Sequence, residues 1–261
     1  MNWLRVFFVG GLTSYRALFR WLNPWVYVPL MLLYPLFQIV FFAYVGRGAG
    51  LGSDRFFLVG NALATIAVAC LFGMGQVIGN ERWFMTLPAL LSSPASRLAL
   101  FLGRSLPTML NGILVAAFAL TTGSLVVGVD LPFGAAGGLA LAILACAFSC
   151  TAFGMWFGAL GLRGRNVGIL ANLVDGIMLV ICGINVPLAD LPGWVQTISR
   201  GLPLTHGIGA ARHVVAGASI GSVGHELAVE VLVGAVYFVV GVALLHVFEL
   251  EGRRTASLES F

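Results

Sequence analysis

Six long apolar runs with almost no charged side chains dominate this sequence and limit the folds it can adopt. They cover residues 24–45, 56–78, 108–129, 133–162, 166–186 and 227–248. Each run is long enough to cross the roughly 30 Å hydrocarbon core of a bilayer as a helix. Only 9% of the 261 residues are charged, whereas a soluble domain carries about a quarter. We therefore predict an all-α integral membrane protein with six transmembrane helices, forming a single transmembrane domain over residues 1–261.

The residues before the first run show a different pattern. In residues 2–22, aromatic and leucine side chains recur at helical spacing, while Arg16 and Arg20 lie four residues apart on the other side. A helix of this kind lies in the membrane interface, with arginines toward lipid phosphates and aromatic rings toward acyl chains. We predict an N-terminal interfacial amphipathic helix, although a frayed basic leader would also explain the pattern.

All 14 basic residues are arginine, and the absence of lysine excludes several kinds of chemistry. A P-loop needs its lysine to hold nucleotide phosphates, so the chain is not itself a P-loop ATPase. A Schiff base likewise needs a lysine amine. The four cysteines lie inside apolar runs without the CxxC spacing of metal or redox sites, which indicates packing. We expect no metal and no cofactor bound by this chain.

The arginines are distributed unevenly between alternate connections. Ten of the 14 fall on the side of the N-terminus and four fall on the other side. Because arginine-rich connections stay in the cytoplasm, both termini and the connection 79–107 are predicted to be cytoplasmic, and the segment 187–226 is predicted to be external. The arginines are scattered at membrane boundaries, so nothing indicates nucleic-acid binding.

Two of these connections carry internal structure. Within 79–107, Ser93 before Pro94 is typical of a helix start, because serine caps the first turn and proline fits within it. Within 187–226, prolines bound two short amphipathic pieces at about 193–200 and 205–216. Neither piece is long enough to cross a bilayer, so we predict an external re-entrant helical segment that is covered by protein.

A few polar side chains interrupt the apolar runs. The second run carries Asn61 and Thr65, and the fifth carries Asn172 and Asp175, three residues apart on one helix face. A carboxylate near the middle of a membrane costs about 2.5–3.5 kcal/mol, so Asp175 is not expected to face lipid. Two interpretations stay open: Asp175 faces a cavity or a second subunit, or it bonds a neighbouring polar group.

Two motifs resemble those of a known family. The first is Glu81 followed by TLPALLSSPASR at residues 86–97, and the second runs from Pro187 through LPGW at 191–194 and LPLTH at 202–206 to Arg212. In this order and at this length the chain resembles the permeases of type-2 ABC exporters, which include daunorubicin-resistance-like, nodulation-factor-like and polysaccharide export permeases. It departs from the family's frequent Gly-Thr by having Met85-Thr86, a difference that would alter the fit to a partner but not the class.

The resemblance implies a permease subunit that is not catalytic alone. It would move an amphiphilic substrate, such as a drug, antibiotic, lipid or glycolipid, out of the cytoplasm or inner leaflet of a bacterial plasma membrane. Two permease copies or paralogues would pair in the lipid bilayer, above separate ABC ATPase subunits that bind ATP and Mg²⁺. Coupling to the ATPase would fall to Glu81, Arg82, Thr86 and Leu87.

The other candidate residues would line the path of the substrate or form a lid on its external side. The translocation cavity or dimer interface would contain Asn61, Thr65, Phe72, Asn172, Asp175 and Met178. The external lid would contain Trp194, His206 and Arg212. Ordinary helix packing is an equally good explanation for the span residues, and Arg82 and Arg97 would suit lipid phosphates.

Two other functions also fit parts of this sequence. A secondary transporter would use Asp175 as an ion or proton site, although no clear internal repeat supports it. An intramembrane enzyme would draw on Ser219 in the GxSxG string at 217–221, with His213 and His225 nearby. That string lacks the strand–turn–helix context of a nucleophile, and a Gly/Ser-rich linker explains it better.

Overall fold

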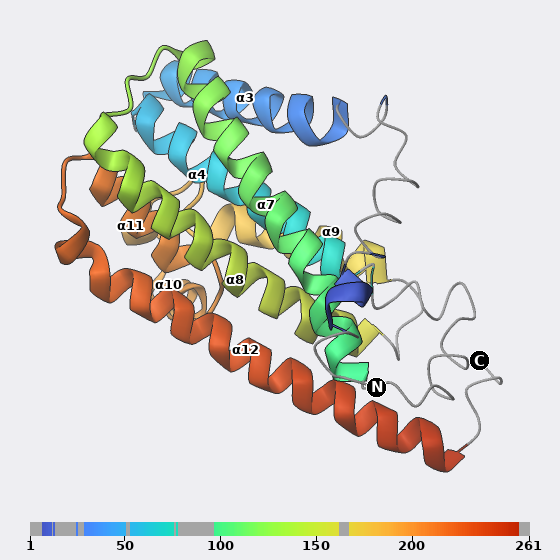
Figure 1. Ribbon diagram of the computed structural model, residues 1–261. Helices are drawn as coiled ribbons and strands as arrows, with labels where there is room; N and C mark the ends of the chain where they lie inside the picture. The colour runs from blue at the N-terminus through green and yellow to red at the C-terminus, as the bar shows by residue number, and fades with distance from the viewer. Residues whose placement is uncertain are drawn as a thin grey trace.

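The computed structural model describes residues 7–11, 13, 25, 29–50, 53–75, 77, 97–161 and 167–255. All regular structure in this part of the chain is helical (Figure 1), which confirms the predicted all-α class. The elements are η1 (Pro29–Leu33), α3 (Tyr34–Ala49), α4 (Asp54–Ala67), η2 (Val68–Phe72), α7 (Arg97–Val127), η3 (Phe133–Ala135), α8 (Ala136–Gly161), α9 (Val167–Ile181), η4 (Leu188–Asp190), α10 (Gly193–Arg200), α11 (Thr205–Val215) and α12 (Ile220–Thr255).

Four helical stretches of the described residues are long and apolar enough to cross a membrane. They are Asp54–Gly75, Leu102–Val127, Phe133–Leu160 and Ile220–Val247, and they match the second, third, fourth and sixth predicted spans. The fifth predicted span contains a shorter apolar helix, Gly168–Ile181. The first corresponds to η1 and α3 together. The protein therefore spans a membrane several times, while the count of six stays a prediction.

Two boundaries differ from the expected ones. The helix α7 begins at Arg97 and continues through Pro107, where the sequence suggested a boundary between loop and span. Proline removes one backbone donor and leaves the carbonyl of Gly103 without its helical partner. Next to Pro107, the hydroxyls of Ser105 and Thr108 bond to carbonyls one turn earlier within α7, at 2.8 and 2.7 Å. At the other end of the chain, α12 begins at Ile220 rather than near residue 227.

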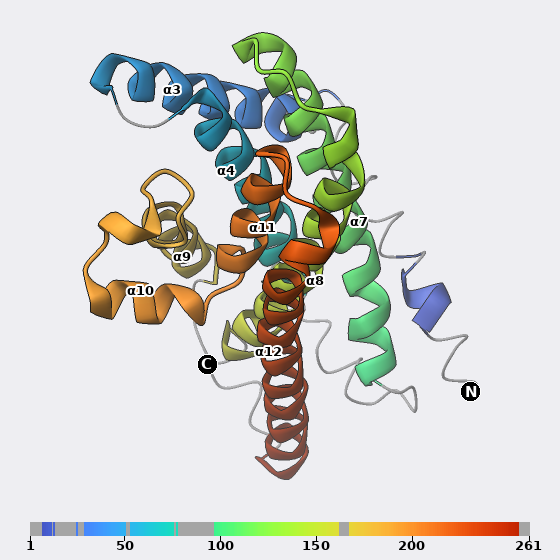
Figure 2. The same ribbon diagram turned by 90° about the vertical axis from the view of Figure 1, so that its left-hand side faces the viewer.

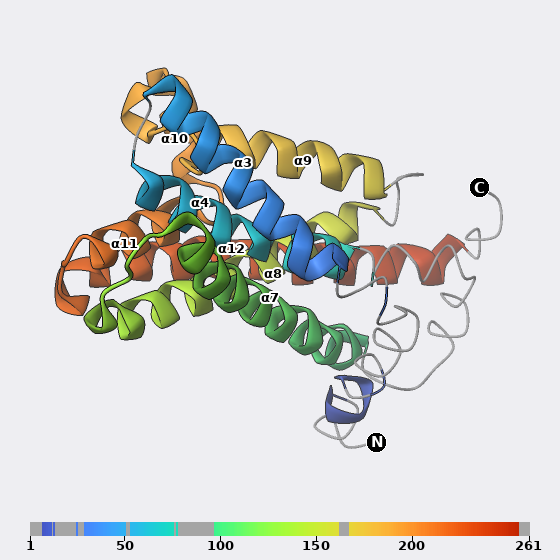
Figure 3. The same ribbon diagram turned by 90° about the horizontal axis from the view of Figure 1, so that it is seen from above.

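The helix α4 forms the centre of the molecule. Every residue from Phe57 to Ala67 is buried, and α3, α7 and α8 pack around it. The helices α8 and α12 lie side by side along much of their length (Figures 1 and 3). Two glycines make this approach possible, since a Cβ at Gly234 or Gly241 would come within about 3 Å of the α8 backbone, at 2.8 Å from Ser149 Cα and 3.0 Å from Trp156 N.

The α-helical pattern of the second span is interrupted by the π-helical turn η2. Such turns insert an extra residue and often mark functional positions in helices. Here a Cβ at Gly154 of α8 would lie 2.9 Å from the Cys70 carbonyl oxygen, and the Cys70 thiol lies next to Gly112 of α7. The turn η2 is therefore packed closely against both α7 and α8, and Cys70 is a packing residue as expected.

The helices α9 and α10 lie at one edge of the molecule. In Figures 2 and 3 they stand apart on the side opposite α7, with α4, α8 and α12 in between. The inner face of α9 touches η2 and α8, and its outer face is uncovered. Residues 7–11, which belong to the predicted interfacial helix, pack on α7, where a Cβ at Gly11 would lie 2.8 Å from the Gly103 carbonyl oxygen.

An ion pair between Arg47 and Asp54 holds the connection between α3 and α4. The Arg47 guanidinium donates to both carboxylate oxygens of Asp54 at 2.7–2.9 Å and to the Val127 carbonyl of α7 at 3.0 Å. The hydrogen bond to Asp54 raises the pKa of Arg47 above its ordinary value. This pair ties the ends of three helices together at the face that the sequence predicts to be external.

Candidate translocation surface and outer segment

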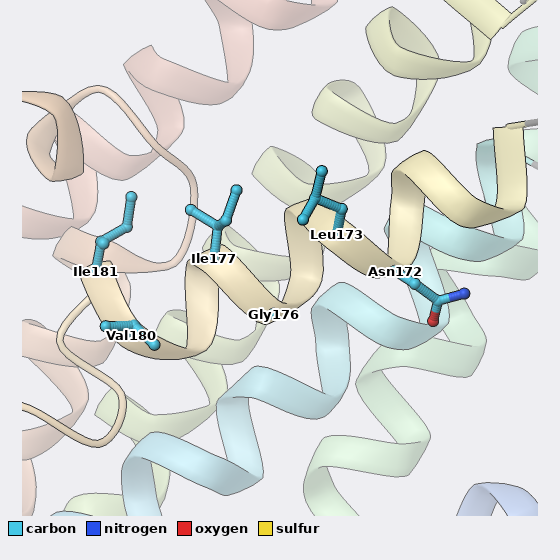
Figure 4. Close-up of a pocket in the computed structure, with 6 residues that line it drawn as sticks. All are labelled: Asn172, Leu173, Gly176, Ile177, Val180 and Ile181. Carbon is cyan, nitrogen blue, oxygen red and sulfur yellow. The ribbon is translucent and has the colours of Figure 1, made fainter.

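The outer face of α9 carries an open groove of about 440 Å³ (Figure 4). Its lining is Asn172, Leu173, Gly176, Ile177, Val180 and Ile181, which all belong to α9. The side chains of Leu173 and Val180 are 58% and 53% exposed, and a Cβ at Gly176 would meet nothing within 4 Å. This face is therefore apolar, open and notched at Gly176.

The three predicted residues of α9 differ in how far they are buried. Asn172 lies at one end of the groove, where its amide donates to the Gly168 carbonyl at 3.0 Å. Asp175 is partly buried. Met178 is only 1% exposed and packs in the core. The arrangement therefore brings Asn172, but not Met178, to the open surface.

The predicted residues of the second span lie inside the protein. Thr65 is buried and donates to the Ala62 carbonyl of its own helix at 2.7 Å. Phe72 is partly buried against the core. Asn61 is fully buried and belongs to a polar chain described next. Among the described residues, no hydrogen bond joins Asn61 or Thr65 to Asn172 or Asp175.

A chain of three amide side chains crosses the core. Gln38 of α3 donates to Asn61 Oδ1 at 3.0 Å, and Asn61 donates to Asn185 Oδ1 at 2.8 Å. Asn61 also donates to the Phe57 carbonyl at 2.9 Å. Because buried amides need partners, this chain fixes α3, α4 and the loop after α9 relative to one another.

Arg212 of α11 holds the loop that follows α9. Its guanidinium donates to the carbonyls of Gly183 at 2.6 Å, Ile184 at 2.9 Å and Phe56 at 3.0 Å. The same group lies 3.5 Å from the centre of the Phe56 ring. Burial lowers the pKa of Arg212, but an arginine remains protonated in a protein. The cation therefore joins α11 to α4 and to the carboxyl end of α9, where helix carbonyls favour positive charge.

Glu230 of α12 holds the opposite end of α11. Its side chain is fully buried, and its Oε1 accepts from the Leu204 amide at 2.8 Å while its Oε2 accepts from the Gly207 amide at 3.0 Å. The Ser149 hydroxyl of α8 also donates to Oε1. The N-cap residue Leu204 offers no side-chain cap, so Glu230 caps α11 from another helix.

Sequence analysis missed this role of Glu230. The available signals were an acid inside an apolar run and a helix start at Leu204-Thr205 without a capping side chain one position earlier. Each signal is ordinary alone. Only the packing of α12 against α8 and α11 joins them.

The other predicted lid residues lie on or between α10 and α11. Trp194 is 70% exposed on α10, opposite the buried Val195 and Ser199. The Ser199 hydroxyl donates to the Ile181 carbonyl at 2.6 Å, so α10 closes the end of α9. A ring nitrogen of His206 lies 3.0 Å from the Arg200 carbonyl and links α10 to α11.

The residues of the possible nucleophile string do not form a catalytic pair. The Ser219 hydroxyl bonds within its own turn, to Ser222. His213 pairs instead with Glu226 at 3.0 Å. The string therefore lies in the turn before α12 and in the first residues of that helix, beside a hydrogen-bonded pair of His213 and Glu226 at the surface. The predicted coupling residues Glu81, Arg82, Thr86 and Leu87 lie outside the described residues.

Comparison with known proteins identifies the class of this helical bundle. Residues 11–216 match the ABC-2 type transporter family, and this stretch includes the helices from α3 to α11. No curated protein and no solved structure matches the chain. Because the match covers most of the 261 residues, the chain belongs to the ABC-2 type transporter family, whose members are transporter membrane subunits.

Proposed function

We propose that this chain is the permease subunit of an ABC exporter in the bacterial plasma membrane. It carries an amphiphilic substrate, such as a drug, antibiotic, lipid or glycolipid, out of the cytoplasm or inner leaflet. The family match over residues 11–216 is the observation that carries this proposal. The absence of lysine supports it, because without a P-loop of its own the chain has to draw energy from another subunit.

The energy comes from separate ABC ATPase subunits that bind ATP and Mg²⁺ on the cytoplasmic side. Their docking surface is the 79–107 connection, with Glu81, Arg82, Thr86 and Leu87 as the contact residues. Charged ends around an apolar middle suit a small docking surface. The described part of this connection supports the proposal, because α7 begins at Arg97 and leads from the connection directly into a membrane span.

The second permease copy packs against the outer face of α9. An apolar face on a short helix at the edge of the bundle is a natural place for another protein surface. Its open notch at Gly176 suits close helix packing, since small residues allow backbones to approach in membranes. In this arrangement Asn172 and Asp175 lie at the boundary between the two copies, beside the path that the substrate takes.

The external segment acts as the lid of that path. The segment from η4 to α11 is fixed to α9 through Ser199 and Arg212 and to α12 through Glu230. A movement of α9 relative to α12 must therefore move α10 and α11. Both termini lie in the cytoplasm in this proposal, in line with the arginine distribution.

The test is co-purification of the permease with candidate ATPase subunits from the same genome, with ATP hydrolysis as the readout. We expect a complex that hydrolyses ATP, and loss of assembly or of coupling in the double variant Glu81→Ala and Arg82→Ala. The matched control is Arg97→Ala, which removes a charge from the same connection next to the span. Failure of a folded permease to bind any ATPase would contradict the proposal and favour a secondary transporter that uses Asp175.

A further inference from the structure

The helix α11 is held at one end by the buried Glu230 and at the other by the partly buried Arg212, and these two side chains do not pair with each other. Glu230 accepts from the amides of Leu204 and Gly207 at its amino end, and Arg212 donates to three carbonyls near its carboxyl end. The negative and positive charges match the positive and negative ends of the helix dipole. At each end of α11, a charged side chain therefore bonds to backbone groups. The two ends differ in their backbone conformation.

The amino end of α11 carries backbone strain. Leu204 has a φ of 74°, and among the described residues no other non-glycine residue has a positive φ. An L side chain rarely adopts this conformation, and such strain persists only where surrounding contacts enforce it. The enforcing contact is visible, because the strained residue's own amide donates to Glu230 Oε1 at 2.8 Å. Removal of this contact takes away the bond that holds the strained residue, while the Thr205 hydroxyl still donates to the Ser199 carbonyl at 2.7 Å.

The carboxyl end of α11 is held without such strain. The Arg212 guanidinium reaches three backbone carbonyls on two elements and stacks on the Phe56 ring. A Cβ at Gly60 would lie 2.6 Å from the guanidinium Nη2, so the glycine of α4 leaves the space that the guanidinium occupies. This end therefore remains attached when the other end is released.

We infer that Glu230 is the positioning residue that latches the amino end of α11 shut, and that the lid opens at this end while the Arg212 end serves as its pivot. The inference rests on the proposed function, since it presumes that the external segment covers a transport path. In this role Glu230, an acid within a membrane span, needs neither a bound ion nor a transferred proton.

The chain contains its own reporter for such an opening. Gly207 of α11 lies against the Cys146 thiol so closely that a Cβ would overlap the sulfur. Cys146 is buried, and release of the amino end of α11 uncovers it. Cys70 is an internal control, because it is buried between α4 and α7, where its thiol bonds to the Thr108 carbonyl at 3.5 Å. Only general loosening of the fold exposes Cys70.

The experiment measures the labelling rate of each cysteine by a membrane-impermeant maleimide. Two full-length proteins are made, each with three cysteines changed to alanine, so that one retains Cys146 and the other retains Cys70. The permease alone is labelled in sealed vesicles of each orientation. Each protein is compared with its Glu230→Gln variant and with a matched control, Glu226→Gln, which alters an acid one turn away that pairs with His213 at the surface.

We expect Glu230→Gln to raise the labelling rate of Cys146 about tenfold or more from the external side, the scale of losing a hydrogen bond to a charged group. Labelling of Cys70 should not change, and Glu226→Gln should change neither rate. Equal increases at both cysteines would show that Glu230 only stabilises the fold. An unchanged Cys146, or an increase only from the cytoplasmic side, would also overturn the inference.

A second variant covers the case in which Glu230→Gln does not fold. Ser149→Ala removes one donor to the Glu230 carboxylate and leaves Glu230 and Arg212 themselves unchanged. It should raise labelling of Cys146 by a smaller factor and leave Cys70 unchanged, and no increase would overturn the inference. The labelling needs no ATPase, so a working latch in a permease that binds no ATPase would contradict the proposed function alone.

Discussion

The amide of Gly207 donates to Oε2 of Glu230 over 3.0 Å, and this contact places a carboxylate from α12 at the start of α11. Together with the partly buried Arg212 near the other end, it gives α11 a charged side chain with backbone partners at each end. Charges in a membrane protein are costly unless they are compensated, and here helix ends and loop carbonyls provide the compensation. The segment from η4 to α11 is therefore packed onto the bundle through specific contacts rather than attached as a loose loop.

Arg212→Lys should destabilise the protein although it retains the charge. An ammonium group cannot reach three carbonyls and stack on Phe56 as the planar guanidinium does. We expect a loss of about 1.5–3 kcal/mol, seen as a lower midpoint of thermal unfolding in detergent. The exposed Arg200→Lys is the control and should have no effect. Equal stability of Arg212→Lys and the unaltered protein would show that the carbonyl contacts contribute nothing.

Asn61→Leu should also lower stability. The substitution removes the acceptor of the partly buried Gln38 and the donor to the partly buried Asn185. Unsatisfied buried groups cost about 1–3 kcal/mol each, so the thermal midpoint should fall clearly. Thr121→Ala is the matched control, because Thr121 is exposed and its hydroxyl bonds only within α7. If both variants unfold at the same temperature, the amide chain is not a stabilising feature.

The tight packing at η2 predicts a strong effect of one added methyl group. In Gly154→Ala the new Cβ lies 2.9 Å from the Cys70 carbonyl oxygen and 3.0 Å from Leu71 Cα, both backbone atoms that cannot move aside. Overpacking of this kind costs about 1–3 kcal/mol. Gly134→Ala adds the same group where nothing lies within 4 Å, and it should leave the unfolding midpoint unchanged. A tolerated Gly154→Ala would mean that α4 and α8 separate easily.

The long apolar helices could be predicted because composition and length alone decide them. Asp54–Gly75 and Phe133–Leu160 agree with the expected spans to within about three residues, the usual uncertainty of helix ends. The end of α9 could not be predicted in this way. Apolar residues continue to Val186, yet the helix ends at Ile181, and Gly183 adopts a φ of 75° just beyond it. Hydropathy does not record where a glycine turns the chain.

The candidate site was less accessible to sequence analysis than the fold. For the polar residues of the spans, the sequence left a translocation cavity, a dimer interface and ordinary packing open, and the structure shows Asn61 and Thr65 hydrogen-bonded inside the core. A sequence shows that a polar side chain needs a partner and does not show which element provides it. The partner of Asn61 is 124 residues away in the chain, and Glu230 lies 26 residues from Leu204. Such pairings follow from the arrangement of the helices.

The outer face of α9 yields a prediction about assembly. Gly176→Trp places a large ring where the single chain has open space, so the fold of one permease should be unaffected. If a second copy packs on this face, the ring should prevent the close approach and weaken the dimer by at least tenfold. The measurement is the mass of the detergent-solubilised permease at several dilutions, with the thermal midpoint as a check on folding.

Gly134→Trp is the control, because it also enters open space but lies in η3, before α8, and not on α9. It should dimerise like the unaltered protein. A Gly176→Trp variant that dimerises normally would exclude this face as the contact between copies. The groove on α9 would then face lipid or substrate, and Asn172 and Asp175 would have to act within a single permease. The two outcomes therefore decide whether the translocation path is shared between subunits or contained in one.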